Sequence, residues 1–146
     1  MKAIIKYNAC LIIDNDTIFK HKVVNRNQFK LLLKFIEEYD IELFIIEKPF
    51  IDNYVANIQF GYLISYLSDK NIIVLEQQKI RKLLFNTNKL STDKLISEVR
   101  VRINVEYPAK QMLNLADCIT MLLYISKIGD INMQNISCKG NEYDIA

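Results

Sequence analysis

The chain has 146 residues, of which 51% are hydrophobic and 25% charged, and its formal net charge is +2 at pH 7. These values are typical of one soluble globular domain and exclude the highly charged, weakly hydrophobic class of disordered chains. No apolar run reaches the roughly 18 residues that span a bilayer, and the start of the chain lacks the apolar region and cleavage site of a signal peptide, so we expect an intracellular, cytoplasmic protein without membrane contact.

The first 24 residues alternate short β-prone runs with polar turn residues. Turns are indicated by Tyr7-Asn8 and by Asp14-Asn15-Asp16, and the runs between them are rich in Ile and Val. This pattern predicts a three-stranded antiparallel meander with strands over residues 2–6, 9–13 and 17–24.

After Asn25 the hydrophobic period changes from two to about 3.6 residues, with Phe29, Leu32, Leu33 and Ile36 at helical spacing. Alternating strands and helices follow up to residue 126. The pattern predicts strands over residues 41–47 and 71–75, and helices over residues 53–68, 78–85, a segment capped by Ser91, and 110–126.

The predicted element order is β-β-β-α-β-α-β-α-α-α, which favours the α/β class. We expect a mixed five-stranded sheet, made of the antiparallel meander and two parallel strands, with helices on its faces. Residues 1–128 form the predicted domain. Residues 129–146 lack clear periodicity and are interpreted as a C-terminal tail.

Charge is distributed unevenly along the chain. Residues 79–110 contain eight Lys or Arg and three Asp or Glu, which gives +5, whereas the remaining residues contain eleven and fourteen, which gives −3. A basic segment of this kind can follow a phosphate backbone. A solvated helical face explains the same pattern, and both interpretations stay open.

Two acidic residues stand in apolar surroundings. Glu47 ends the run Ile41-Glu-Leu-Phe-Ile-Ile-Glu47, and Asp117 lies within the last predicted helix, one turn after Asn114. Because an unpaired buried carboxylate is costly, two such placements require a shared cation or a shared partner. A metal site is one interpretation, and a buried hydrogen bond or a Lys partner for Asp117 is the other.

The order of these features resembles the RuvC family of Holliday-junction resolvases over about residues 2–126. The features are the meander, the strand ending Ile-Ile-Glu47-Lys-Pro-Phe, a helix with Gly61 midway, the Ser-Thr-Asp-Lys94 turn and the helix with Leu-Ala-Asp117-Cys-Ile. The resemblance implies an RNase H-like fold, a homodimer and cleavage of branched DNA with Mg²⁺ or Mn²⁺ bound by four acidic residues. Two such ions activate water and stabilise the leaving oxygen.

Carried over to this chain, the resemblance matches Glu47 and Asp117 to two of the four acidic positions, as catalytic residues and metal ligands. Asn114 takes the third position and offers a neutral carbonyl oxygen. The first-strand aspartate has no counterpart, and Lys6 lies near its place. We therefore interpret the site as an ion-paired, metal-free remnant in which the Lys6 ammonium replaces the ion. The alternative is that Asp14 or Asp16 supplies the missing ligand.

The same resemblance places the basic segment near the junction backbone. Its predicted DNA contacts are Arg81, Lys82, Lys89, Lys94, Arg100 and Arg102. Phe85 either stacks on a base or packs in the core. Contacts to phosphate of this kind give affinity without sequence readout.

Other residues indicate little chemistry. His21, far in sequence from the carboxylates, is a weak general-base candidate, and Tyr54, Tyr62 and Tyr66 at helical spacings favour packing. With three glycines and none in a strand-to-helix turn, the chain cannot form a P-loop or Rossmann cradle. Gly61 predicts close approach of another backbone, either from a helix across a dimer interface or from the sheet beneath.

The three cysteines, Cys10, Cys118 and Cys138, have no C-x-x-C pair and predict neither a disulfide framework nor a zinc site. We expect reduced thiols. The many Ile, Asn and Lys residues indicate an AT-rich genome, which fits a phage, virus, mobile element or low-GC bacterium equally well.

The sequence favours a RuvC-like protein that binds branched DNA with a degraded site and weak or absent nuclease activity. Its alternatives are an active Mg²⁺-dependent resolvase, a nuclease-dead structural or protein-interaction module, and an unrelated α/β domain.

Overall fold

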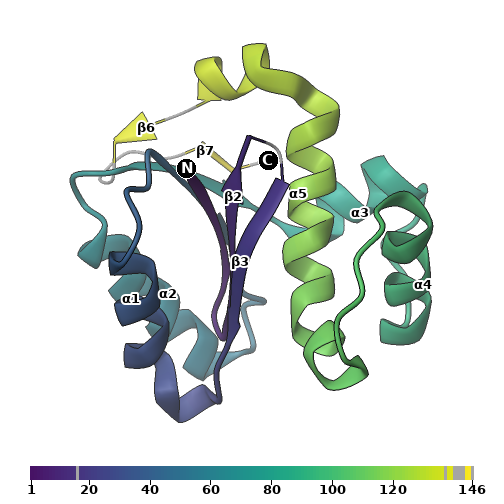
Figure 1. Cartoon of the computed structure of the whole chain (residues 1–146), viewed down its shortest axis with the longest axis horizontal. Helices are drawn as coiled ribbons and strands as arrows, with labels where there is room; N and C mark the ends of the chain where they lie inside the picture. The colour runs from purple at the N-terminus through teal and green to yellow at the C-terminus, as the bar shows by residue number, and fades with distance from the viewer. Residues whose placement is uncertain (16, 137, 140–143, 146) are drawn as a thin grey trace.

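A mixed β-sheet with helices on both faces forms the body of the molecule (Figure 1). The computed structural model describes residues 1–15, 17–136, 138–139 and 144–145, and side chains up to residue 128. Its elements are β1 (Lys2–Lys6), β2 (Ala9–Asp14), β3 (Thr17–Val23), a 3₁₀ turn η1 (Arg26–Gln28), α1 (Phe29–Glu37), β4 (Leu43–Glu47), α2 (Tyr54–Tyr66), β5 (Asn71–Leu75), α3 (Gln77–Phe85), α4 (Thr92–Arg102), α5 (Ala109–Ile136), β6 (Cys138–Lys139) and β7 (Asp144–Ile145).

The strand order confirms the predicted sheet. β3, β2 and β1 are antiparallel neighbours, and β1, β4 and β5 are parallel neighbours, giving the order β3-β2-β1-β4-β5. The two short strands β6 and β7 were not predicted. They lie along β5, β6 antiparallel at Asn71 and Ile72, and β7 parallel at Ile73 and Val74.

Strand alternation divides the apolar side chains between two cores. On β1, Ile4 packs with α3, α4 and α5, whereas Ala3 and Ile5 pack with α1 and α2 on the opposite face. Figure 1 shows these two helix groups on opposite sides of the sheet. Successive side chains of a strand point to opposite faces of the sheet. The parity of a residue, meaning its odd or even position along the strand, therefore decides which helices it contacts.

Most predicted element boundaries lie within two residues of those observed, but the last helix is longer. It was predicted to end at Ser126 and instead continues to Ile136, through Gly129 and past the predicted domain boundary. A helical glycine costs about 1 kcal/mol relative to alanine, so it weakens a helix without ending it. Among the described residues, no helix is long and apolar enough to cross a membrane.

The described cysteine side chains agree with the expected reduced state. Cys10 and Cys118 are free and buried, and burial raises the pKa of both thiols. Both therefore stay protonated near neutral pH and act as small apolar side chains. The side chain of Cys138 lies outside the described residues.

The predicted domain over residues 1–128 leads to a truncation test. The described core ends with Ile125 and Ile128, so we expect a chain that stops after residue 128 to fold cooperatively. It loses the strands along β5 and should be less stable by about 1–3 kcal/mol, the net value of a few hydrogen bonds. Urea unfolding followed by circular dichroism measures this against the full chain; residues 1–136, which lack the same two strands but keep α5, are the control. A truncated chain without a cooperative transition would refute the boundary.

Candidate functional site

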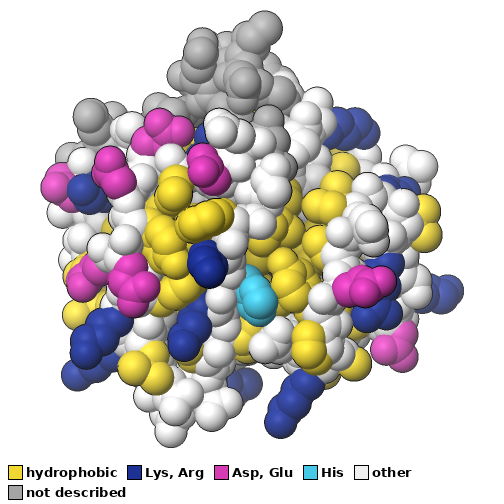
Figure 2. Space-filling view, in the orientation of Figure 1, with side chains coloured by type: hydrophobic (Ala, Val, Ile, Leu, Met, Phe, Trp, Pro, Cys, Tyr) yellow, Lys and Arg dark blue, Asp and Glu magenta, His cyan; other side chains and the backbone are white. Residues whose placement is uncertain are grey.

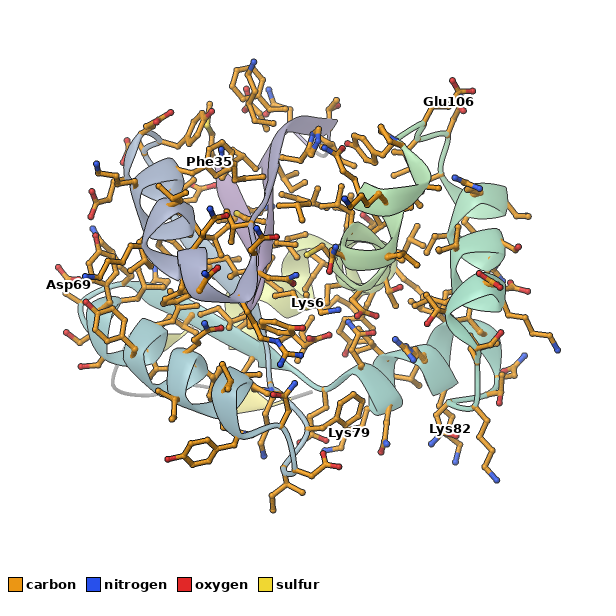
Figure 3. All side chains as sticks on the ribbon, turned by 90° about the horizontal axis from the view of Figure 1, so that it is seen from below. Lys6, Phe35, Asp69, Lys79, Lys82 and Glu106 are labelled. Carbon is orange, nitrogen blue, oxygen red and sulfur yellow. The ribbon has the colours of Figure 1, made fainter. Side chains whose placement is uncertain are left out.

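Four ionisable side chains, those of Lys6, Glu47, Arg81 and Asp117, form a cluster where β1 and β4 end; we call it the Asp117 cluster. β1 and β4 are parallel with Ile5 opposite Ile46, so Lys6 and Glu47 are the next residues along the two neighbouring strands. Their parity places both on the face that α5 covers. Seen from this end of the molecule, Lys6 lies near the centre, between the sheet and the helices of that face (Figure 3).

Asp117 of α5 is held by two cations. Lys6 Nζ donates to Asp117 Oδ2 at 2.6 Å, and Arg81 Nη2 donates to Asp117 Oδ1 at 2.5 Å. The side chains of Lys6, Arg81 and Asp117 are 14%, 16% and 13% exposed, so water weakens these pairs little. The predicted contact between Lys6 and Asp117 is present, and both carboxylate oxygens have a cationic partner.

Arg81 is the member that sequence reasoning missed. It was expected on the surface as a DNA contact, but α3 carries it into the cluster. Gln77, one turn earlier, aligns it: its Oε1 accepts from Arg81 Nε at 3.2 Å, and its Nε2 donates to the Asp117 carbonyl at 3.0 Å. The available signal was the i, i+4 spacing of Gln77 and Arg81 at the start of a helix that follows a buried strand.

Among the described residues, no cation forms an ion pair with Glu47. Its Oε1 is shielded from solvent and has no hydrogen-bond partner among the described residues. Burial raises the pKa of Glu47 to about 8, and the charge of Asp117 adds to this shift, while Lys6, a hydrogen bond with Gln77 and the charge of Arg81 oppose it. Glu47 is therefore mostly protonated at pH 7, which removes one negative charge from the cluster.

The opposing charges act on Lys6 as well. Burial is the largest influence on its pKa and would lower it, but the charges of Asp117 and Glu47 together with the hydrogen bond to Asp117 outweigh burial and raise the pKa. Lys6 is thus a permanent cation in this environment.

Asn114 faces a second amide. The Nδ2 of Asn8, in the β1–β2 turn, donates to Asn114 Oδ1 at 2.8 Å. Asn8 is only 9% exposed, and its own Oδ1 has no partner among the described residues. The carbonyl oxygen that was expected to serve as a neutral metal ligand is thus already used as an acceptor.

Of the two alternative ligands, Asp14 is described and does not reach the cluster. Asp14 ends β2, and in the β1–β2 ladder Ile13 lies opposite Lys2, at the far end of the strand from Lys6. Five residues of strand separate the two ends, about 16 Å. Asp14 is therefore excluded as a replacement, and Asp16 lies outside the described residues.

Phe85 and His21 contact side chains outside the Asp117 cluster. Phe85 packs partly buried against the core with the Arg102 guanidinium 4.7 Å from its ring centroid, which agrees with the core interpretation. His21 Nε2 lies 3.1 Å from Gln111 Oε1, and its ring is 4.5 Å from that of Tyr107. Neither residue contacts the carboxylates.

The remaining predicted DNA contacts lie on the surface. Lys82, Lys89, Lys94, Arg100 and Arg102 are exposed residues on α3, the following loop and α4. Figure 3 shows Lys82 at the periphery, pointing away from the body of the molecule. Arg102 is paired with Glu98 one turn earlier, so part of its charge is neutralised.

Comparison with known proteins supports the fold. No family model and no curated protein sequence matches the chain. Among solved structures, the chain is similar to RuvC from Thermus thermophilus, with a TM-score of 0.56 over 88% of this chain and 96% of that one, at 8% sequence identity. The fold is RNase H-like. An identity this low shows the fold alone, so the chemistry has to be argued from the residues.

The donor set does not fit a divalent ion. Metal sites in nucleases use oxygen ligands, mostly carboxylates. Here both oxygens of Asp117 contact cations, and the Asn114 oxygen accepts from Asn8. Among the described residues, no three His, Cys, Asp or Glu side chains are grouped as metal ligands. Lys6 and Arg81 supply fixed positive charge at the carboxylate that would have to bind such an ion.

The raised pKa of Glu47 gives a test by pH. Its ordinary pKa is 4.5 and its folded value about 8, so between these values the folded state binds more protons and stability falls as pH rises. Lys6 stays charged in this pH range and therefore adds no pH dependence to the free energy of unfolding. We expect Glu47→Gln to remove that fall, so that relative to the native protein it gains more than about 1 kcal/mol between pH 5 and pH 9.

The measurement is the free energy of urea unfolding at pH 5, 7 and 9. Glu42→Gln is the matched control, because Glu42 is an exposed carboxylate close to the same strand. Identical pH profiles for the native protein and Glu47→Gln would show that Glu47 titrates normally.

Proposed function

We propose that this protein is a RuvC-like DNA-binding protein that recognises branched DNA, including four-way junctions, and has weak or absent nuclease activity. The observation that carries the proposal is the Asp117 carboxylate bracketed by Lys6 and Arg81. Its two oxygens are unavailable to an ion, while the RNase H-like scaffold and its exposed basic helices are intact.

Fixed cations cannot replace the chemistry of an ion. A bound metal lowers the pKa of its water and generates hydroxide at neutral pH, whereas an ammonium or guanidinium supplies charge alone. Lys6 and Arg81 therefore neutralise the buried carboxylate and hold α3, α5 and the sheet together. This accounts for a preserved fold without hydrolysis of a phosphodiester bond.

A gel assay with a labelled four-way junction and a matched linear duplex tests the proposed function. We expect junction-selective binding in EDTA and no cleavage with Mg²⁺ or Mn²⁺. Symmetric nicks that appear only with metal would show an active resolvase and contradict the proposal that Lys6 and Arg81 keep an ion from Asp117. Failure to bind either DNA would contradict DNA recognition and leave a protein-interaction module.

The exposed lysines lead to a quantitative expectation. In Lys82→Gln/Lys89→Gln/Lys94→Gln, three phosphate contacts are lost, so junction binding should weaken and the slope of log K against log salt should fall by about 0.9 per contact. The matched control neutralises three exposed lysines elsewhere, Lys20, Lys22 and Lys34. The measurement is fluorescence anisotropy between 50 and 200 mM salt, roughly the range over which such slopes are defined. If both triple variants lose the same affinity for the junction, the DNA does not bind preferentially at Lys82, Lys89 and Lys94.

The proposed partner includes a second copy of the chain, and α2 supports this. Its 13 residues contain no charged side chain, and Tyr54, Ile58 and Tyr62 are exposed by 76%, 55% and 57%. Tyr62 packs against the rings of Phe29 and Tyr66, which agrees with the packing interpretation, yet much of its surface remains exposed. A two-fold axis sets a surface against itself, so an uncharged apolar stripe suits this contact because like charges would repel.

Gly61 adds to the argument for α2. A Cβ placed on Gly61 would meet nothing within 4 Å in the described chain, and the residue is exposed. The sheet beneath therefore does not require a glycine there, which removes one of the two sequence explanations. Close approach of a second helix is the remaining one.

Ile58→Glu tests this interface. The substitution places a charge in the middle of the stripe, so we expect the dimer to dissociate into folded monomers, with an affinity loss of at least about 100-fold. Val101→Glu is the control, since Val101 is an apolar residue on α4 that is 83% exposed. Sedimentation equilibrium gives the mass; a native monomer, or an unchanged dimer in Ile58→Glu, would rule out the α2 interface.

A further inference from the structure

A polar cleft of about 300 Å³ opens beside the Asp117 cluster. It lies between the β1–β2 turn, the segment after β3 and the start of α5, and its lining contains no aspartate or glutamate. Figure 1 shows the start of α5 and the segment between β3 and α1 at the same end of the molecule. In the lower part of the visible face Lys and Arg side chains lie at the surface (Figure 2).

The rim of the cleft is positively charged. Arg26 and Lys110 are exposed on opposite sides of it, and among the described residues neither forms an ion pair with a carboxylate. The cleft also contains the first turn of α5, which has no acidic residue. The N-terminus of a helix carries partial positive charge and free N–H groups that favour phosphate.

The floor of the cleft carries a buried amide that is only half satisfied. Asn8 lines the cleft and is 9% exposed; its Nδ2 donates to Asn114 Oδ1, and its own Oδ1 has no partner in the part of the chain that the structure describes. Rotating both amides by a half-turn keeps their bond and leaves an N–H₂ group in place of the oxygen. In either orientation one buried polar group needs a partner, which is costly unless a ligand supplies it.

A larger cleft on the other side of the cluster lacks these properties. It measures about 490 Å³, and its lining includes Lys48 and Glu76. Glu76 is paired with both Lys48 and Lys79, so the positive charge there is neutralised. The smaller cleft therefore differs in having free cations at its rim and an unsatisfied amide at its floor.

We infer that the smaller cleft binds one nucleotide of a DNA strand, with its phosphate between Arg26 and Lys110 and its base edge against the amides of Asn8 and Asn114. Asparagine amides both donate and accept, so they pair with the edges of unpaired bases. Gln111 on the cleft wall is positioned by its contact with His21. The inference rests on the proposed DNA-binding function and specifies where an unpaired base would be read.

The nucleotide would lie next to the closed site. Asn114 is one helical turn from Asp117, and Asn8 is two residues after Lys6. A base bound there would place its DNA strand beside the Asp117 cluster, which does not hydrolyse it. The cleft therefore supplies recognition of an unpaired nucleotide, such as one displaced at a junction, in addition to charge along the backbone.

Titration of the full ¹⁵N-labelled chain with inorganic phosphate and with each deoxynucleoside 5′-monophosphate tests the inference. We expect nucleotides to shift the side-chain amide signals of Asn8 and Asn114 and to bind about tenfold more tightly than phosphate at equal ionic strength. Arg26→Gln/Lys110→Gln should weaken nucleotide binding by about tenfold or more. The control Lys34→Gln/Lys70→Gln removes the same charge from exposed positions outside the cleft.

Two results would overturn the nucleotide cleft. One is equal affinity for phosphate and nucleotides, which would mean an anion site without base contacts. The other is the absence of shifts at Asn8 and Asn114 in a protein that still binds junctions, which would contradict this inference alone. Nucleotide binding at the cleft without any junction binding would instead contradict the proposed function and leave the cleft intact.

Discussion

The structure depends on how the buried carboxylate of Asp117 is neutralised. α5 packs across the sheet with an aspartate on its inner side, at the ends of two parallel strands, where a lone charge would cost several kcal/mol. Lys6 from β1 and Arg81 from α3 meet its two oxygens. Removing one partner of such a pair typically costs about 3–5 kcal/mol, so these contacts connect three separate elements of the fold.

A site that neutralises its carboxylates with side chains has different capabilities from one that uses ions. Lys6 and Arg81 are always charged and always present, so the cluster needs no cofactor to fold. They supply no activated water, and the protonated state of Glu47 at neutral pH removes the charge that would attract an ion. Lys6 and Arg81 thus stabilise the fold at this carboxylate and occupy the oxygens that an ion would need.

Most of the fold could be predicted from the sequence because the local turn and strand patterns agreed with the overall order of the elements. The turn residues at Tyr7-Asn8 and the apolar runs of β1 and β4 determined the strands, and strand parity then placed Lys6 and Glu47 under α5. Arg81 was assigned to DNA contact because its place in a basic segment does not show which helix face it occupies; only its i, i+4 spacing from Gln77 indicates the inner face. The exposure of the α2 tyrosines was not predicted because helical spacing cannot distinguish an inner stripe from an exposed one. The length of α5 was underestimated because Gly129 weakens a helix without ending it.

The most direct test of whether Lys6 and Arg81 keep Asp117 from binding an ion is Mn²⁺ binding to the native protein, measured by calorimetry. Asp117→Asn is the control, and Lys6→Asp/Asn114→Asp is a variant that adds two carboxylates beside Asp117 and removes one of its cations. The account predicts that native protein and Asp117→Asn bind Mn²⁺ equally weakly, and that the double variant gains affinity. Binding to the native protein at micromolar Mn²⁺ that disappears in Asp117→Asn would contradict it, because Lys6 and Arg81 would then yield the carboxylate to an ion.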